Sequence, residues 1–192
     1  KNRMEVHKNY LSQLYVALAS NIAEISPGDL KISFFPSSGS ESVEGALKMA
    51  FKRANPDDEN QSRNLLIRSS QSFHGKLFGA GAATASPELN YKFPKPFETI
   101  DFIRNNSESL LKAIEKSKNN SKSNAFAIIY EPFSASLCED SSNEFLQLLR
   151  KVATKENITL IIDEVYSGFY KTGPLFNFMH SNIVPDIVTF GK

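Results

Sequence analysis

The chain has 192 residues, which is enough for one domain with a sizeable hydrophobic core. Its 22 Lys and Arg residues nearly balance 21 Asp and Glu residues, so charge gives no argument for a nucleic-acid or acidic-membrane partner. A single cysteine, Cys138, excludes a disulfide within the chain, and no apolar run has the length of a membrane span. We therefore expect a cytoplasmic protein that binds neither nucleic acid nor membrane.

The first part of the sequence predicts two helices separated by a turn and a strand. Apolar side chains recur at helical spacing over residues 6–25 and again over 41–53. Residues 26–29, Ser-Pro-Gly-Asp, have strong turn chemistry and end the first helix. The short apolar run at 32–35 predicts a buried strand that leads into the second helix.

The middle of the sequence predicts short elements joined by surface segments. A strand is expected at residues 65–67, after the polar connection 55–63, and a small-residue-rich helix at 75–85. The prolines of residues 86–99 predict a surface segment without a regular element, whereas 107–117 again has a helical pattern.

Continuous apolar runs dominate the last part of the sequence. Residues 125–130, 159–162 and 187–190 predict buried strands, and 142–156 predict an amphipathic helix between the first two. Buried strands that alternate with helices are typical of an α/β domain with a mainly parallel sheet. In such a sheet, ligands bind at the carboxyl ends of the strands.

Residues 37–40, Ser-Ser-Gly-Ser, lie between a predicted strand and a predicted helix, where an anion can bind. Free N–H groups at a helix start and the helix dipole both favour a phosphate. Gly39 lets the backbone approach closely, and the hydroxyl of Ser40 can donate a further hydrogen bond. The alternative is an ordinary turn with serine as N-cap, which is commoner for this pattern alone.

Asp163 and Lys192 each follow a predicted strand and therefore belong to the expected ligand side of the sheet. A carboxylate there can keep a heteroaromatic nitrogen protonated, although Asp163 could equally cap the next turn. A lysine there can form a Schiff base when its amine is neutral. The alternative for Lys192 is a solvated surface charge.

Phe73-His74-Gly75 comes just after a predicted strand. Phe73 could stack on a cofactor ring or simply pack in the core, and His74 alone would more often be a satisfied structural imidazole. His7 and His180 have no metal-ligand spacing, so no metal site is expected. The glycine motifs of dinucleotide-binding, P-loop and α/β-hydrolase proteins do not occur.

Four segments together resemble the class III aminotransferases of pyridoxal 5′-phosphate (PLP) fold type I, which include ornithine, acetylornithine and other ω-aminotransferases. They are residues 34–48, 72–76, 131–132 and 163–192, and the last is the most specific. The resemblance implies a three-layer αβα large domain with a mainly parallel sheet. Residues 1–192 would be an incomplete part of this PLP-binding domain, without the family's N-terminal segment, the remainder of the large domain and the C-terminal small domain.

The resemblance also implies a role for each cofactor-binding residue. Gly39 and Ser40 match the family's phosphate-binding turn. Phe73 matches the aromatic residue stacked on one face of the pyridine ring, and Val165 matches the aliphatic residue on the other face. His74, next to Phe73, is placed in the same cofactor-binding group.

The resemblance names two catalytic residues. Asp163 matches the carboxylate paired with the ring nitrogen, and Lys192 matches the lysine that forms the internal aldimine and moves a proton between Cα and C4′. Tyr166 stands where many members have glutamine; its phenol could reach the 3-oxygen of the cofactor or just pack. Ser136 stands where ornithine-type enzymes have a gating glutamate, which puts an ornithine-type substrate switch in doubt.

These features predict a PLP-dependent aminotransferase that acts on a small amino donor and a carbonyl acceptor, and a homodimer, since family sites form at a dimer interface. An amino-acid racemase or epimerase of the same fold shares every motif and remains an alternative. A non-catalytic scaffold is a second alternative, against which the presence of both Asp163 and Lys192 argues.

Overall fold

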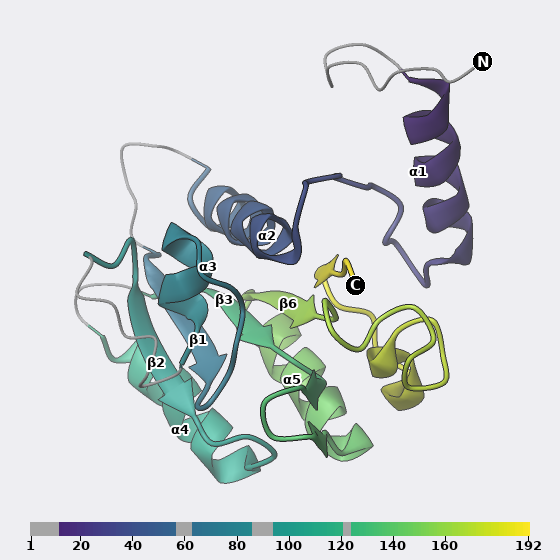
Figure 1. Ribbon diagram of the computed structural model, residues 1–192. Helices are drawn as coiled ribbons and strands as arrows, with labels where there is room; N and C mark the ends of the chain where they lie inside the picture. The colour runs from purple at the N-terminus through teal and green to yellow at the C-terminus, as the bar shows by residue number, and fades with distance from the viewer. Residues whose placement is uncertain (1–11, 57–62, 86–93, 121–123) are drawn as a thin grey trace. The chain divides into compact units, whose positions relative to one another are not determined.

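The computed structural model describes residues 12–56, 63–85, 94–120 and 124–192 (Figure 1). The chain divides into a first unit, Lys1–Phe35, and a second unit, Pro36–Lys192. Every predicted site residue belongs to the second unit. Among the described residues, no helix combines the length and the apolarity that a membrane crossing requires.

In the first unit, helix α1 (Gln13–Ile25) is followed by a segment without regular structure. Nζ of Lys31 donates to the carbonyl oxygens of Ala23 at 2.7 Å and Ser26 at 2.8 Å, which folds this segment back against the end of the helix. The helix predicted over residues 6–25 is therefore confirmed from Gln13 onward. Its residues 6–11 lie outside the described part of the chain.

The strand predicted at residues 32–35 is wrong. The structure has no strand there, and Ile32 is 97% exposed and Phe34 58% exposed in the chain. A strand needs a neighbouring strand to pair its backbone N–H and C=O groups, and a short apolar run alone does not show that one is within reach. The turn at residues 37–40 therefore precedes a helix but does not follow a strand.

The second unit is built on a sheet of five strands in the order β2-β1-β3-β6-β7, and all neighbouring strands are parallel. The strands are β1 (Leu65–Ser69), β2 (Glu98–Phe102), β3 (Ala125–Tyr130), β6 (Thr159–Asp163) and β7 (Ile187–Thr189). The central strands β1, β3 and β6 are buried along their whole length, which explains their continuous apolar runs. The predicted parallel sheet is confirmed.

Helices cover both faces of this sheet. Figure 1 shows α2 (Gly39–Ala54) and α3 (Phe78–Ala83) on one face, and α4 (Ser107–Lys118) and α5 (Asn143–Lys155) on the other. The face of α2 that the apolar spacing predicted is the buried one, and it packs in one cluster with residues of β1, β3 and β6. The arrangement is the expected three-layer α/β architecture.

An edge strand, a short hairpin and a 3₁₀ helix were not expected from the sequence. The segment 86–99 was predicted to lack a regular element, but β2 begins at Glu98; residues 86–93 lie outside the described part of the chain. Among the described strands, β2 pairs with β1 alone, so only part of its surface is buried and its apolar pattern is weak. The other two elements are the hairpin of β4 (Phe133–Ser134) and β5 (Glu139–Asp140), and the 3₁₀ helix η2 (Asn177–Ser181).

Replacement of a fully buried residue of β6 tests this architecture. Ile161 is fully buried in the cluster that joins α2 and α3 to the sheet. Ile161→Ala in the complete protein should lower the free energy of unfolding by about 2–5 kcal/mol, because it removes buried methyl groups and leaves a cavity. Leu111→Ala, at a half-exposed position of α4, should lower it by less than about 1 kcal/mol. Equal losses in urea unfolding would contradict the packing described for β6.

Candidate active site

The site lies where several strands of the sheet end. The chain leaves β1 for the edge strand β2 and then returns to the other side of β1 for β3, so the strand order reverses between β1 and β3. Ligands of open parallel sheets bind at such a reversal, outside the carboxyl ends of the strands. His74, Glu131 and Lys192 follow β1, β3 and β7 respectively, and Asp163 is the last residue of β6.

The carboxylate of Asp163 is buried and held by three hydrogen bonds. Its Oδ1 accepts from the Val165 N–H at 3.0 Å and from the Thr189 hydroxyl at 3.0 Å. Its Oδ2 lies 2.7 Å from Nδ1 of His74. A carboxylate offers about four lone-pair positions, so one position on Oδ2 is left for a further donor. Asp163 can therefore accept a hydrogen bond from a ring N–H without losing its own orientation.

The imidazole of His74 orients the Asp163 carboxylate. Its ring is fully buried, and its main-chain N–H donates to the hydroxyl of Thr84 at 2.9 Å. With Nδ1 as the donor to Asp163, Nε2 is a buried nitrogen without a partner among the described residues. The sequence favoured a purely structural role for His74. That interpretation is incomplete, because the histidine also orients the Asp163 carboxylate.

The start of α2 presents unpaired N–H groups. Ser38 is the N-cap and accepts from the Glu41 N–H at 3.3 Å, while the Glu41 carboxylate accepts from the Ser37 N–H at 2.6 Å. Within the described residues, the N–H groups of Gly39 and Ser40 meet no acceptor. The segment is therefore both a capped turn and a place where backbone N–H groups can hold an anion.

Close backbone approaches join this turn to the rest of the site. A Cβ on Gly39 would lie 2.5 Å from Cγ1 of Val165, and one on Gly191 would lie 3.8 Å from Cα of Gly39. Gly75 has a φ of +122°, and a Cβ there would lie 2.4 Å from the Ser40 hydroxyl oxygen. Glycine is required at Gly39 and Gly75. These contacts bring together the turn, Val165 and Gly191, which lies two residues after β7.

The remaining predicted residues are two aromatic side chains, Phe73 and Tyr166, and Lys192. Phe73 is 38% exposed, its N–H donates to the Glu131 carboxylate at 3.0 Å, and its ring has no aromatic partner within the described part of the chain. The ring of Tyr166 stacks on Phe133, with centroids 6.0 Å apart. Nζ of Lys192 lies 5.9 Å from the centroid of the Tyr166 ring.

Two buried glutamates, Glu131 and Glu164, belong to segments that carry the resemblance but were not predicted as site residues. Burial raises the pKa of Glu131, and the neighbouring His74 and the Phe73 N–H offset this only in part. Burial also raises the pKa of Glu164, whose carboxylate accepts from the Ser167 hydroxyl and the Phe178 N–H. A glutamate is seldom fully buried, so sequence position alone gave little signal for either. Both carboxyls hold loop backbone in place around Asp163.

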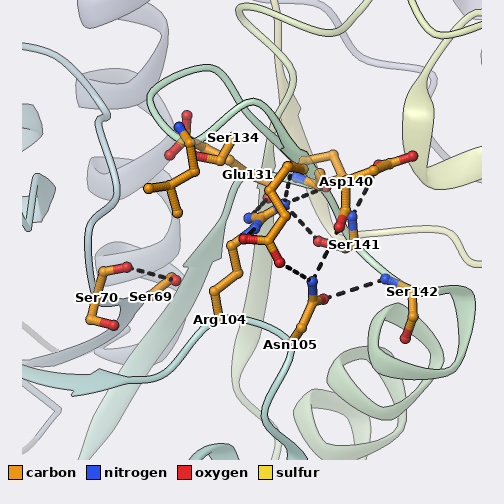
Figure 2. A network of polar contacts seen from close by, with 12 residues as sticks. Ser69, Ser70, Arg104, Asn105, Glu131, Ser134, Asp140, Ser141 and Ser142 are labelled. Carbon is orange, nitrogen blue, oxygen red and sulfur yellow. Dashed lines mark hydrogen bonds and ion pairs between the residues drawn. The ribbon is translucent and has the colours of Figure 1, made fainter.

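Arg104 anchors the segment that follows β3 (Figure 2). Its guanidinium donates to the carbonyl oxygens of Glu131 at 2.6 Å and Pro132 at 2.7 Å, and also to the Ser141 hydroxyl at 2.9 Å. It lies over the ring of Tyr130, 5.0 Å from the centroid. These bonds fix both ends of the β4–β5 hairpin. This role was not predictable from the sequence, because it depends on distant backbone oxygens.

The residues present fit PLP. The open lone pair of Asp163 suits a pyridinium N–H, and the N–H groups of Gly39 and Ser40 suit a phosphate. The exposed ring of Phe73 and the side chain of Val165 are apolar surfaces for the two faces of a planar ring. Among the described residues, no group of three or more His, Cys, Asp and Glu side chains could hold a metal ion.

Comparison with protein families gives one match over nearly the whole chain. The model of the family Aminotransferase class-III matches residues 3–192. This match agrees with the resemblance carried by the sequence segments and with the arrangement of the site.

Solved structures of transaminases have the same fold. A transaminase from the marine bacterium Virgibacillus is 26% identical with a TM-score of 0.83, over 95% of this chain and 42% of its own. An (S)-enantioselective ω-transaminase from Thermomicrobium roseum is 29% identical with a TM-score of 0.82, over 93% of this chain and 43% of its own. The ornithine aminotransferase from Toxoplasma gondii, with PLP at partial occupancy, is 23% identical with a TM-score of 0.72 over 82% of this chain and 36% of its own, and shows the fold alone. The chain thus spans less than half the length of these proteins.

The close approach at Gly39 generates a prediction. Gly39→Ala would press a methyl group against Val165 and displace the N–H groups at the start of α2. We expect the dissociation constant for PLP, measured by fluorescence titration of the complete protein, to rise roughly tenfold or more, since a shift of these donors weakens charge-assisted hydrogen bonds. Gly81→Ala is the matched control, because its nearest atom is 3.6 Å away. Equal PLP affinity in both variants would contradict the proposed cradle.

The buried carboxyl of Glu164 generates a pH prediction. Its pKa is raised in the folded protein, so its contribution to stability is present below the unfolded pKa and is lost as pH rises through the folded pKa. Glu164→Gln keeps the acceptor for Phe178 and removes this titration. As pH rises from 4 to 8, we expect the free energy of unfolding of the variant to increase relative to that of the original protein. Urea unfolding measures this difference. A relative loss as pH rises would show that the charged form is favoured instead.

Proposed function

Because this chain belongs to the class III aminotransferase family, we propose that it is part of a PLP-dependent aminotransferase. The enzyme would transfer an amino group between an amine or amino acid and a keto acid or aldehyde. Residues 1–192 would form part of its large domain, in a homodimer located in the cytoplasm. The chain spans less than half of the solved transaminases that it resembles, and the remainder of the protein would complete the substrate site.

The observation that carries this proposal is the position of the Asp163 carboxylate. It is buried, held by Val165, Thr189 and His74, and keeps one acceptor position open at a strand end. A charged acceptor in a desolvated site favours a proton on the nitrogen of a bound pyridine ring. A protonated pyridine is what makes PLP an electron sink for the charge left when a proton leaves the substrate Cα.

Each residue then has a physical task. The N–H groups of Gly39 and Ser40 would bind the phosphate, and Phe73 and Val165 would enclose the ring from its two sides. His74 would keep Asp163 turned toward the ring nitrogen. Their shared effect is to fix the cofactor before a substrate arrives, which lowers the entropic cost of the reaction.

Lys192 would supply the amine that holds the cofactor and would later act as a base. Once a substrate amine replaces it, Nζ would be free to take the proton from the substrate Cα and to deliver it to C4′ of the cofactor. Next to Lys192, Gly191 comes close to Gly39, so the reactive lysine is attached at the edge of the phosphate turn. The base would then lie beside the cofactor cradle, which comes from a distant part of the chain.

The reaction itself tests the proposal. PLP-loaded complete protein is mixed with a panel of amines and no acceptor. We expect loss of the visible cofactor band together with release of a carbonyl product in a 1:1 ratio to the sites. Borohydride treatment before the amine should attach the cofactor to Lys192. Exchange of the α-hydrogen without carbonyl release would indicate a racemase or epimerase, and attachment to another lysine would refute the assignment of Lys192.

Asp163→Asn tests the carboxylate separately. The amide retains the size of the side chain and can keep partners at its oxygen, but it cannot hold a proton on the ring nitrogen by charge. PLP should still bind, while turnover should fall by roughly a hundredfold or more, in the range seen when one key electrostatic group is lost. Turnover near the original value would contradict the role of Asp163.

A further inference from the structure

The segment 72–75, which follows β1 and carries His74, is held by the residues just after α3. The Ala85 N–H donates to the Ser72 carbonyl oxygen at 2.9 Å. Next to this bond, the hydroxyl oxygen of Thr84 accepts from the main-chain N–H of His74 at 2.9 Å. The two bonds pair the segments as neighbouring strands are paired, except that one acceptor is a side chain.

The hydroxyl of Thr84 is buried and also has a use for its proton. Its oxygen lies 3.0 Å from the carbonyl oxygen of Gly75 and 3.1 Å from that of Ala80, and a hydroxyl can donate to one of them. Gly75 has a φ of +122°, and a glycine adds no side-chain contact that would fix the chain there. The Thr84 hydroxyl therefore supplies a constraint on the backbone of residues 74–75 that Gly75 itself cannot supply.

Thr84 is itself fixed by a buried cation of β1. The guanidinium of Arg68 donates to the carbonyl oxygens of Thr84 at 2.6 Å and Ala82 at 2.7 Å. Nε of Arg68 lies 2.7 Å from a carboxylate oxygen of Asp101 on β2, which orients the guanidinium. Charge-assisted hydrogen bonds of this kind are stronger than neutral ones, so the end of α3 is firmly attached to the sheet.

The start of α3 is attached to α2 in the same way. The Glu44 carboxylate accepts from the N–H groups of Gly79 at 3.1 Å and Ala80 at 2.8 Å. A Cβ on Gly79 would lie 3.0 Å from the Glu44 carboxylate oxygens, so the small residues of α3 permit this close approach. Because both ends of α3 are anchored, Thr84 is a fixed point from which a neighbouring segment can be positioned.

The segment that Thr84 holds carries the partner of the Asp163 carboxylate. Nδ1 of His74 lies 2.7 Å from Oδ2 of Asp163, and the imidazole is fully buried. The direction of a buried ring follows from the backbone that carries it, since its surroundings leave little room for another rotamer. Two buried hydrogen bonds in series thus connect the Thr84 hydroxyl to the Asp163 carboxylate.

We propose that Thr84 is a positioning residue for the ring-nitrogen end of the cofactor site. Its hydroxyl fixes the backbone of His74, His74 fixes the direction of Asp163, and Asp163 would accept the N–H of the pyridine ring. Thr84 would act without touching the cofactor. The inference rests on the proposed PLP-dependent function and assigns a role to a residue that was not predicted from the sequence.

The test measures how strongly the complete, cofactor-free protein prefers PLP to an analogue in which C–H replaces the ring nitrogen. Fluorescence titration gives both dissociation constants, and the original protein should bind PLP more tightly. Thr84→Val keeps the size of the side chain but leaves the buried His74 N–H without its acceptor. The preference for PLP should fall about three- to tenfold, as expected for one lost buried hydrogen bond.

Two variants serve as controls for the hydroxyl. Thr84→Ser keeps the hydroxyl and should keep the preference. Thr159→Val makes the same substitution at a buried threonine at the opposite end of β6 from Asp163, where the hydroxyl oxygen accepts from Arg53 at 3.1 Å. It should leave the preference for PLP unchanged.

A double variant tests whether the effect passes through the carboxylate. In an Asp163→Asn background, Thr84→Val should change the preference by less than about twofold, because the carboxylate on which it acts is already absent. A further fall of the size seen in the original protein would overturn the inference.

A purely structural role for Thr84 gives different results. Equal weakening of PLP and the analogue by Thr84→Val would overturn the inference, and so would an equal fall in preference in Thr159→Val. If Thr84→Val does not fold, Thr84→Ala and Thr84→Ser give the same comparison, since they differ by the hydroxyl alone. Failure of the original protein to bind PLP would contradict the proposed function instead.

Discussion

The arrangement of the site depends on the three hydrogen bonds that hold the Asp163 carboxylate. They come from three parts of the fold: the His74 imidazole after β1, the Thr189 hydroxyl at the end of β7, and the Val165 N–H just after β6. A buried carboxylate is costly unless its oxygens are bonded, and here the bonds also fix its direction. The carboxylate is therefore fixed in direction, and its three bonds use three of its roughly four acceptor positions.

Two further buried carboxyl groups lie near Asp163. Glu131 and Glu164 lie nearby, and burial raises the pKa of both, so the site contains more carboxyl groups than it can cheaply ionise. Each of them accepts backbone N–H groups of a neighbouring loop, and Arg104 holds the loop after β3 through its carbonyl oxygens. Burying these polar groups costs free energy. In return, the shape of the site is set before any ligand binds, which lowers the entropic cost of binding.

Much of the fold was predictable, because buried parallel strands have continuous apolar runs: residues 125–130 and 159–162 are β3 and nearly all of β6. The run at 32–35 has the same local pattern but pairs with no strand in the described part of the chain, and β2 has a partner but a weak pattern. Both predictions failed for lack of tertiary information. In the site, Asp163 and Gly39 were identifiable from their place next to a strand or helix. The hydrogen bond between His74 and Asp163 was not predictable, since it joins residues 89 positions apart.

The most direct test of the account is the protonation state of the cofactor's ring nitrogen. The complete protein would be loaded with PLP labelled with ¹⁵N in the ring, and the nitrogen chemical shift would be followed by NMR as pH is raised from 6 to 9. We predict a protonated nitrogen throughout, because the oriented Asp163 carboxylate holds the proton well above the pH at which free PLP releases it. A nitrogen that is neutral over this range would contradict the central role assigned to Asp163.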